Sequence, residues 1–246
     1  MKAAPQAQQR LLDLAKLDSV LDRLAHRRRT LPELAQIEEL SARLARASTQ
    51  VIAAETEVSD LGREQAKAES DVEAVRARAD RDQKRLDSGQ VSSPKDLANL
   101  QSEIASLKRR QADLEEVVLE IMERREAADA RVTRLIAERD EVAAARAAAE
   151  DRRDAAFAEI DKEQAEVSGG RAAITADIPA DLLSLYEKLR GQYGVGAAML
   201  YGGRCQGCKV SLSIADLNAI RAAAPDEVLR CEECRRILVR TPESGL

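Results

Sequence analysis

The sequence predicts a mainly α-helical protein, a long antiparallel coiled-coil hairpin followed by a small C-terminal zinc-ribbon domain. Three observations support this fold class. Apolar residues recur every 3.5 positions over long stretches, Gly, Ser and Pro interrupt that pattern near residue 90, and two C-x-x-C pairs lie near the C-terminus. A sustained heptad spacing is typical of left-handed coiled coils.

The composition argues against one large globular core. The chain has 246 residues, of which 34% are charged and only 2% are aromatic. A core of that size needs aromatic bulk, whereas small and aliphatic residues dispersed among charges suit helices with a narrow apolar seam. The formal net charge is −5 with both signs interleaved. Charge therefore gives no general case for nucleic-acid or membrane binding.

The sequence contains neither a membrane span nor a signal peptide that we can recognise. No apolar run approaches the roughly 20 residues that cross a bilayer. Residues 1–10 are polar and lack the apolar centre of a signal peptide. We therefore expect a cytoplasmic protein, in which paired cysteines indicate metal rather than disulfides.

The first half of the hairpin is predicted from two seams. A shorter helix is expected over residues 8–29, followed by a long helix whose seam runs from Ile37 to Leu86. Most core positions of that seam are apolar, with Gln65 and Asp82 as exceptions. Thr30, Pro32 and Glu33 predict a capping box at the start of the long helix.

The hairpin tip is predicted at residues 87–96. Gly89 and the neighbouring serines break the first helix, and Ser93 with Pro94 restarts a second. The second seam begins at Leu97 and is expected to end at residues 168–170, Ser-Gly-Gly. Two matched seams joined by a short turn fold back on each other, and the break disfavours the alternative of a parallel dimeric coiled coil.

Pairing Leu86 with Leu97 sets a predicted register for the hairpin. Gln65 would then face Val118, and Val72 would face Gln111. Each polar seam residue would meet an apolar one, which costs stability but can fix the register.

We predict two domains, the hairpin over residues 1–178 and the zinc ribbon with a leading short helix over residues 179–246. The leading helix is expected at Ala180–Arg190 and a strand within residues 191–203. A second short helix should be capped by Ser213 and Asp216. Val228–Leu229 and Ile237–Val239 should form a β-hairpin.

The four cysteines carry the strongest chemical signal. Cys205, Cys208, Cys231 and Cys234 form two C-x-x-C pairs, a spacing that places four thiolates around one Zn²⁺. Four cysteine ligands leave no position for water or substrate, so the predicted site is structural. Gly207 is expected to relieve strain in the first turn. The alternative is a set of reduced or disulfide-paired cysteines.

The chain resembles bacterial coiled-coil proteins with a C-terminal four-cysteine zinc ribbon. The resemblance covers most of the chain and is specific at Ser88–Gly89, residues 94–97, 100–101, 103–104, 107–111, 114–115, 217–221 and 231–238. It implies a nucleic-acid- or protein-binding role without known catalysis; some such relatives are linked to flagellar or type III secretion and to transcription factors. One departure is Arg235, where the family usually has Gly after the last Cys. A left-handed conformation there would cost about 1–2 kcal/mol.

No catalytic apparatus is visible. His26 is the only histidine and lies in a charged helix, where we expect it to be solvated. Without a partner for acid–base or nucleophilic chemistry, an enzyme is not expected.

Two functions remain open from the sequence. The favoured hypothesis is a non-enzymatic adaptor or scaffold that binds unidentified protein partners through the coiled coil and the ribbon. Its candidate partner-binding tip consists of Gln90, Val91 and Lys95, although Val91 could instead plug the end of the seam. A monomer is expected, with a dimer as the alternative.

The second hypothesis is a nucleic-acid-binding regulatory protein. Its candidate contacts are Arg230, Arg235, Arg236 and Arg240 of the ribbon. Acidic residues nearly balance the basic ones there, and a zinc tetrathiolate adds a charge of about −2. Only clustering of these arginines on one face would favour nucleic acid.

Overall fold

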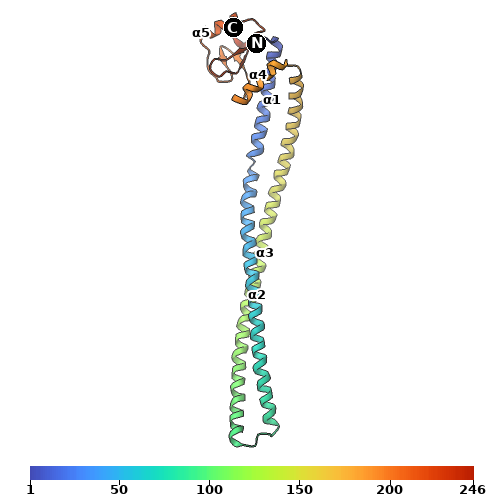
Figure 1. Cartoon of the computed structure of the whole chain (residues 1–246), viewed down its shortest axis with the longest axis vertical. Coiled ribbons are helices and arrows are strands. Elements are labelled where there is room, and N and C mark those ends of the chain that lie inside the picture. Colours follow the sequence, from blue (N-terminus) through green and yellow to red (C-terminus); the bar gives the residue numbers. More distant parts are fainter. The chain divides into compact units, whose positions relative to one another are not determined.

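A computed structural model describes residues 1–246 and shows a mainly helical chain with a small sheet near its C-terminus (Figure 1). The predicted fold class is confirmed. The elements in chain order are α1 (Pro5–Arg29), α2 (Pro32–Asp87), α3 (Pro94–Ala176), α4 (Ala180–Tyr193), β1 (Ala197–Tyr201), β2 (Arg204–Cys205), α5 (Ile214–Ala222), β3 (Leu229–Arg230), β4 (Ile237–Val239) and the 3-10 turn η1 (Pro242–Ser244). No helix combines the length and the apolar content needed to cross a membrane.

The chain divides by its contacts into two compact units. The hairpin unit is Ala35–Glu150, and the ribbon unit joins Met1–Leu34 to Asp151–Leu246. Both ends of the chain therefore belong to the ribbon unit. The boundary between residues 178 and 179 divides the chain by sequence and remains a prediction.

The hairpin unit consists of α2 and α3 running antiparallel on either side of the turn at residues 88–93 (Figure 1). Gly89 adopts a φ of 65°, which suits a residue without a Cβ. Buried aliphatic side chains form the seam: Leu40, Val51, Ala54, Leu61, Ala68, Ala79, Ile104, Ile121, Ala128, Leu135 and Ala149. Ion pairs such as Arg131–Glu57 at 3.1 Å and Arg124–Glu64 at 3.5 Å flank it.

The predicted register of the hairpin is wrong. The guanidinium of Arg125, rather than Val118, lies beside Gln65 and donates to its Oε1 atom at 3.1 Å. Val72 lines one hollow together with Val118 rather than facing Gln111. Gln65 thus has a long charged side chain of the partner helix as its neighbour, whereas Gln111 donates to Glu115 of its own helix. The prediction paired each polar seam residue with an apolar one and did not consider these polar partners.

The predicted end of the second arm at residues 168–170 is also wrong, because α3 continues through Gly169 and Gly170 to Ala176. Each helical glycine costs about 1 kcal/mol relative to alanine. Packing against α1 offsets that cost. Beyond the glycines, Arg171 binds Asp18 of α1 at 2.7 Å, and Ile174 packs on the core of the ribbon unit.

Asp18 is a buried carboxylate at the centre of a polar network between α1, α3 and α4. Its Oδ1 atom accepts from Arg171 at 2.7 Å, and its Oδ2 atom accepts from the hydroxyl of Tyr186 at 2.6 Å and pairs with Arg190 at 3.3 Å. A buried charge is tolerated only when it is paired and hydrogen-bonded in this way. The network fixes how the three helices meet.

The predicted capping box between Thr30 and Glu33 is not formed. The Thr30 hydroxyl donates to the His26 carbonyl at 3.0 Å and so closes α1 instead of opening α2. One carboxylate oxygen of Glu33 is buried without a hydrogen-bond partner. The junction is held by packing, since Leu31 is buried with Ile160 in one apolar cluster.

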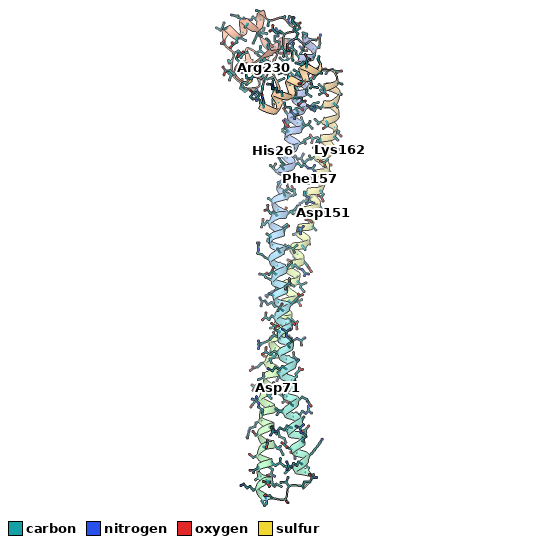
Figure 2. All side chains as sticks on the ribbon, in the orientation of Figure 1. His26, Asp71, Asp151, Phe157, Lys162 and Arg230 are labelled. Carbon is teal, nitrogen blue, oxygen red and sulfur yellow. The ribbon has the colours of Figure 1, made fainter.

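The same cluster contains the only phenylalanine. Phe157 of α3 packs against it, and the guanidinium of Arg28 lies 4.3 Å from the ring centroid (Figure 2). This cation–π contact joins α1 to α3 within the ribbon unit.

The ribbon sheet has the strand order β2-β1-β4-β3. β1 and β4 are parallel, and the outer pairs are antiparallel. The predicted β-hairpin is present, with Leu229 opposite Leu238. The predicted cap of α5 is present too, because Ser213 and Asp216 form a reciprocal capping box.

The N-terminal segment completes the sheet edge, which the sequence reasoning missed. The amide of Ala3 donates to the Asp226 carbonyl at 2.7 Å, and that of Val228 donates to the Met1 carbonyl at 3.1 Å. Lys2 and Glu227 form an antiparallel bridge. These contacts join the two ends of the chain and give no local signal in the sequence.

Candidate metal centre

The four cysteines converge at one point of the ribbon unit. Cys205 ends β2, Cys231 follows β3, and Cys208 and Cys234 close the two turns. All four Sγ atoms lie within 4.8 Å of one another. Two of these separations are 3.8 Å, between Cys205 and Cys234, and 3.9 Å, between Cys208 and Cys231.

These separations fit a zinc ion and do not fit disulfides. A disulfide brings its sulfur atoms to about 2.05 Å. Four thiolates at about 2.3 Å from a tetrahedral Zn²⁺ are about 3.8 Å apart. The site can therefore hold one zinc ion, and with four protein ligands no open position remains for substrate or water.

The two C-x-x-C turns have the same backbone geometry. The residue after each second cysteine, Lys209 or Arg235, donates its amide to the carbonyl of the first cysteine at 2.8 Å in both cases. Their φ angles are 63° and 61°. Arg235 therefore has the left-handed conformation whose cost was considered from the sequence, and Lys209 repeats it in the first turn.

Glycine at position 207 is required for a different reason from the one predicted. Its φ is not positive, so the first turn does not need glycine for its dihedral angles. A Cβ there would lie 2.9 Å from Cβ of Ala198 and 3.1 Å from Cδ of Arg236. The glycine lets the first turn pack closely on the sheet.

An apolar cluster surrounds the thiols. Cys205 and Cys231 are buried with Ala198, Leu200, Ile220 and Leu238. Burial raises the pKa of Cys205, and it raises the pKa of Cys231 to about 12. Burial also acts on Cys234, but hydrogen bonds from the Arg236 amide and from the Cys231 thiol outweigh it and lower the pKa of Cys234.

Raised thiol pKa values mean that the cation must displace protons. Thiolates are the zinc ligands, so binding to this site releases protons and weakens as the pH falls. Because the bound ion also organises both turns, its binding energy contributes to the folding of the ribbon.

The four candidate nucleic-acid arginines are engaged within the ribbon unit. Arg240 donates to four backbone carbonyls at and beyond the end of α5, among them that of Ala223 at 2.9 Å. Arg236 donates to the carbonyls of Val195 and Tyr193 at 3.1 Å and 2.9 Å.

The other two arginines are more exposed but also have partners. The Nε atom of Arg230, which Figure 2 places on the ribbon, donates to the carbonyl of Arg235 at 2.8 Å. Arg235 pairs with Glu232 at 3.7 Å. Sequence reasoning missed that these side chains bind the protein's own acceptors. Their role as nucleic-acid contacts remains a prediction.

The remaining candidate residues lie away from the cysteines in sequence. Gln90 and Lys95 at the hairpin tip are exposed, and Val91 is half-buried. His26 is exposed on α1, as predicted (Figure 2).

Comparison with known proteins places these features in a family. Residues 14–194 match a family model described as a CT398-like coiled coil hairpin domain, and residues 204–238 match one described as a C4-type zinc ribbon domain. The resemblance inferred from the sequence and the expected zinc cofactor are thereby confirmed. An uncharacterized protein of Mycobacterium tuberculosis is 42% identical over 240 residues, which is 98% of both chains.

Two solved structures share the fold. A protein from Mycobacterium smegmatis has a TM-score of 0.86 at 37% identity, covering 98% of this chain and 100% of that one. CT398 from Chlamydia trachomatis has a TM-score of 0.69 at 18% identity, covering 96% and 98%. At that identity, the similarity to CT398 shows the fold alone.

Proposed function

This chain belongs to the CT398-like coiled-coil hairpin proteins with a C4-type zinc ribbon, and from that premise we propose that it is a non-enzymatic adaptor for protein partners. Coiled-coil and zinc-ribbon domains fit a structural or binding role. We propose Cys205, Cys208, Cys231 and Cys234 as the ligands of one structural Zn²⁺. The ion would hold the two turns together and supply no chemistry to a substrate.

The observation that carries this proposal is the exposed apolar surface of the ribbon. Ile214, the first residue of α5, is 79% exposed. Tyr201 and Val210 are also exposed, at 53% and 41%, on the segment that precedes α5. Contiguous exposed apolar side chains mark a contact surface, and we propose that these three side chains form one.

A hollow beside the metal centre supports the same function. It has a volume of about 620 Å³ between α5 and β3, and its apolar lining includes Leu212, Ile220, Leu229 and Leu238. Charged side chains, among them Asp216 and Arg230, line the same hollow. A hollow with both apolar and charged walls beside a closed tetrathiolate centre suits docking of a partner.

The hairpin tip is the second proposed contact site. Gln90 and Lys95 are exposed there, on a turn bounded by Gly89 and Pro94. The tip belongs to the hairpin unit and the metal centre to the ribbon unit. Two sites on separate units could bind different partners, which is what an adaptor requires.

The test is affinity capture from a nuclease-treated lysate with the full-length zinc-loaded chain. We expect protein partners to survive nuclease treatment. One variant, Ile214→Ser with Val210→Ser, should lose the ribbon partners, and Gln90→Ala with Val91→Asp should lose the tip partners. Ile52→Ser, at another exposed apolar position, is the matched control.

Each alternative gives a different outcome. If the partners are lost on nuclease treatment, the nucleic-acid-binding function replaces the adaptor function as the explanation. Partners retained by the tip variant and lost only on disruption of the ribbon would make the tip structural. Helicity and zinc content should be unchanged in every variant except those at the cysteines.

A further inference from the structure

Two adjoining hollows lie between α2 and α3 in the hairpin unit. One has a volume of about 290 Å³ and the other about 480 Å³, and Leu119 lines both. Together they form one groove, here named the acidic groove, on the stretch of α2 near Asp71 (Figure 2). Val72 of α2 and Val118, Leu119, Met122, Glu123 and Glu126 of α3 are among its lining residues.

The centre of the acidic groove is apolar and uncovered. Leu119 is 60% exposed and Met122 is 46% exposed, while Val72 and Val118 form a half-buried floor. Methionine adapts its shape readily and is common on surfaces that accept a partner. Two large apolar side chains beside one half-buried floor make a contact surface rather than isolated exposed residues.

The charge around this centre is strongly one-sided. Five acidic side chains line the groove, Glu69, Glu115, Glu123, Glu126 and Asp129, against one basic side chain, Arg125. Residues 112–130 of α3 as a whole hold seven acidic and two basic side chains. Arg125, the one basic residue in the lining, is engaged by Gln65 and by Asp129. Glu123 and Glu126 have neither an ion-pair nor a hydrogen-bond partner in the structure, so they are available to an incoming cation.

The dimensions suit a helix. From Glu115 to Asp129 the groove follows α3 for about 20 Å, or four helical turns. A third helix can lie along the groove between two antiparallel helices, as in helical bundles. Such a helix would present apolar residues at i, i+3, i+4 and i+7 to Leu119 and Met122 and basic residues to the rim.

A second copy of this chain is a poorer occupant. A twofold arrangement centred on Leu119 and Met122 would bring the acidic segment 112–130 against itself. Repulsion between like charges opposes that contact, and it equally opposes nucleic acid or an anionic membrane.

We infer that the acidic groove is a docking site for a basic amphipathic helix of a partner protein. The inference rests on the proposed adaptor function and adds a third contact site with a defined chemistry. Apolar contacts to Leu119 and Met122 would supply affinity, and Glu123 and Glu126 would select basic helices and speed association.

The test measures binding to the full-length protein by fluorescence anisotropy at low salt. The probe is a labelled peptide of about 18 residues, five helical turns, with Leu at the i, i+3, i+4, i+7 spacing and Lys elsewhere. A scrambled peptide of the same composition and an analogue with Glu in place of Lys are the reference probes. We expect the Leu/Lys helix to bind and both reference probes to bind at least about ten-fold more weakly.

Variants at exposed positions locate the site without disturbing the seam. Leu119→Gln with Met122→Gln should weaken binding of the Leu/Lys helix by about ten-fold or more. Ile52→Gln with Val117→Gln, at exposed apolar positions outside the groove, should not. Glu123→Lys with Glu126→Lys should shift the preference to the Leu/Glu peptide, a gain that loss of folding cannot produce.

The remaining outcomes overturn the inference. These are no binding of the Leu/Lys helix, equal binding of the scrambled peptide, equal loss in the control variant, or a dimer of the chain that Leu119→Gln disperses. Failure here would leave the lysate capture by the wild-type chain unaffected, so the adaptor proposal and the groove fail separately.

Discussion

At the scale of single residues, the two turns of the metal centre place Lys209 and Arg235 in a conformation that favours glycine. Their φ angles of 63° and 61° are left-handed. Each such residue carries about 1–2 kcal/mol of strain. The hydrogen bond from its backbone amide to the carbonyl of the first cysteine and the geometry of the site hold it in this conformation. Arg235 could be identified from the family pattern, whereas Lys209 became visible only as its structural equivalent.

Replacing Arg235 by Gly should therefore stabilise the zinc-loaded ribbon. We expect a gain of about 0.5–1 kcal/mol, since relief of strain outweighs the added freedom of the unfolded chain. The exposed pair with Glu232 that is lost contributes little. Thermal unfolding with excess zinc measures the gain. Arg235→Ala removes the same side chain but keeps the strain, so an equal gain in that variant would contradict the explanation.

The buried network around Asp18 gives a prediction in stability and in pH. Burial, reinforced by the Asp18 carboxylate, raises the pKa of Tyr186 well above its ordinary value of about 10. Above pH 10 the unfolded chain loses the phenol proton while the folded chain keeps it, so the free energy of unfolding falls as the pH rises. Below pH 10 this contribution is complete.

Tyr186→Phe should lower the free energy of unfolding by about 1–3 kcal/mol at neutral pH, because one oxygen of buried Asp18 loses its hydroxyl donor. The difference from the wild type should shrink above pH 10. Urea unfolding at neutral pH and near pH 10.5 measures both effects. Tyr193→Phe, at an exposed position, is the control. A difference that stayed constant with pH would show that Tyr186 does not titrate as described.

At the scale of elements, the sequence predicted which segments are helical better than where they meet. Heptad spacing, the Gly/Ser/Pro break and the Ser213 cap each act locally, and α2, the tip and α5 were placed correctly. Register depends on side chains from both helices, and there the pairing of Gln65 with Val118 failed. The predicted helix end at Gly169 and Gly170 was wrong for a related reason, since packing against α1 allows α3 to continue through both glycines.

The continuity of α3 makes Gly169 a site for stabilisation. A Cβ at Gly169 would meet nothing within 4 Å. Gly169→Ala should raise the free energy of unfolding by about 1 kcal/mol through helix propensity alone. Gly196→Ala is the contrasting variant, because its Cβ would lie 2.5 Å from the Tyr186 carbonyl and should destabilise the protein. A loss of stability in Gly169→Ala would restore the predicted helix break at that position.

At the scale of the whole molecule, the ribbon unit is built from both ends of the chain. Met1–Ala3 pair with residues 226–228, and α1 shares an apolar core with α4, β1 and β4. The cysteine spacing predicted that four thiols converge on one point, because each C-x-x-C pair is local. It could not predict that the first residues of the chain complete the same sheet, since the contacting segments are separated by almost the entire sequence.

Removing zinc should unfold the zinc ribbon while the hairpin unit stays folded. The folding of the cysteine turns and of the apolar cluster of Leu200, Ile220 and Leu238 should depend on the ion. Without the ion, no bond links the four clustered cysteines. The hairpin unit has its own buried seam from Leu40 to Ala149. A chelator should therefore abolish protection of residues 197–239 against hydrogen exchange, together with that of the Ala3 amide, which pairs with Asp226.

The same experiment should leave residues 35–150 protected and most of the helical circular dichroism intact. A Cys231→Ser, Cys234→Ser variant should reproduce the pattern without chelator, and added zinc should restore protection only in the wild type. Loss of protection throughout residues 35–150 would show instead that zinc stabilises the hairpin as well. The division into two compact units would then describe contacts but not cooperativity.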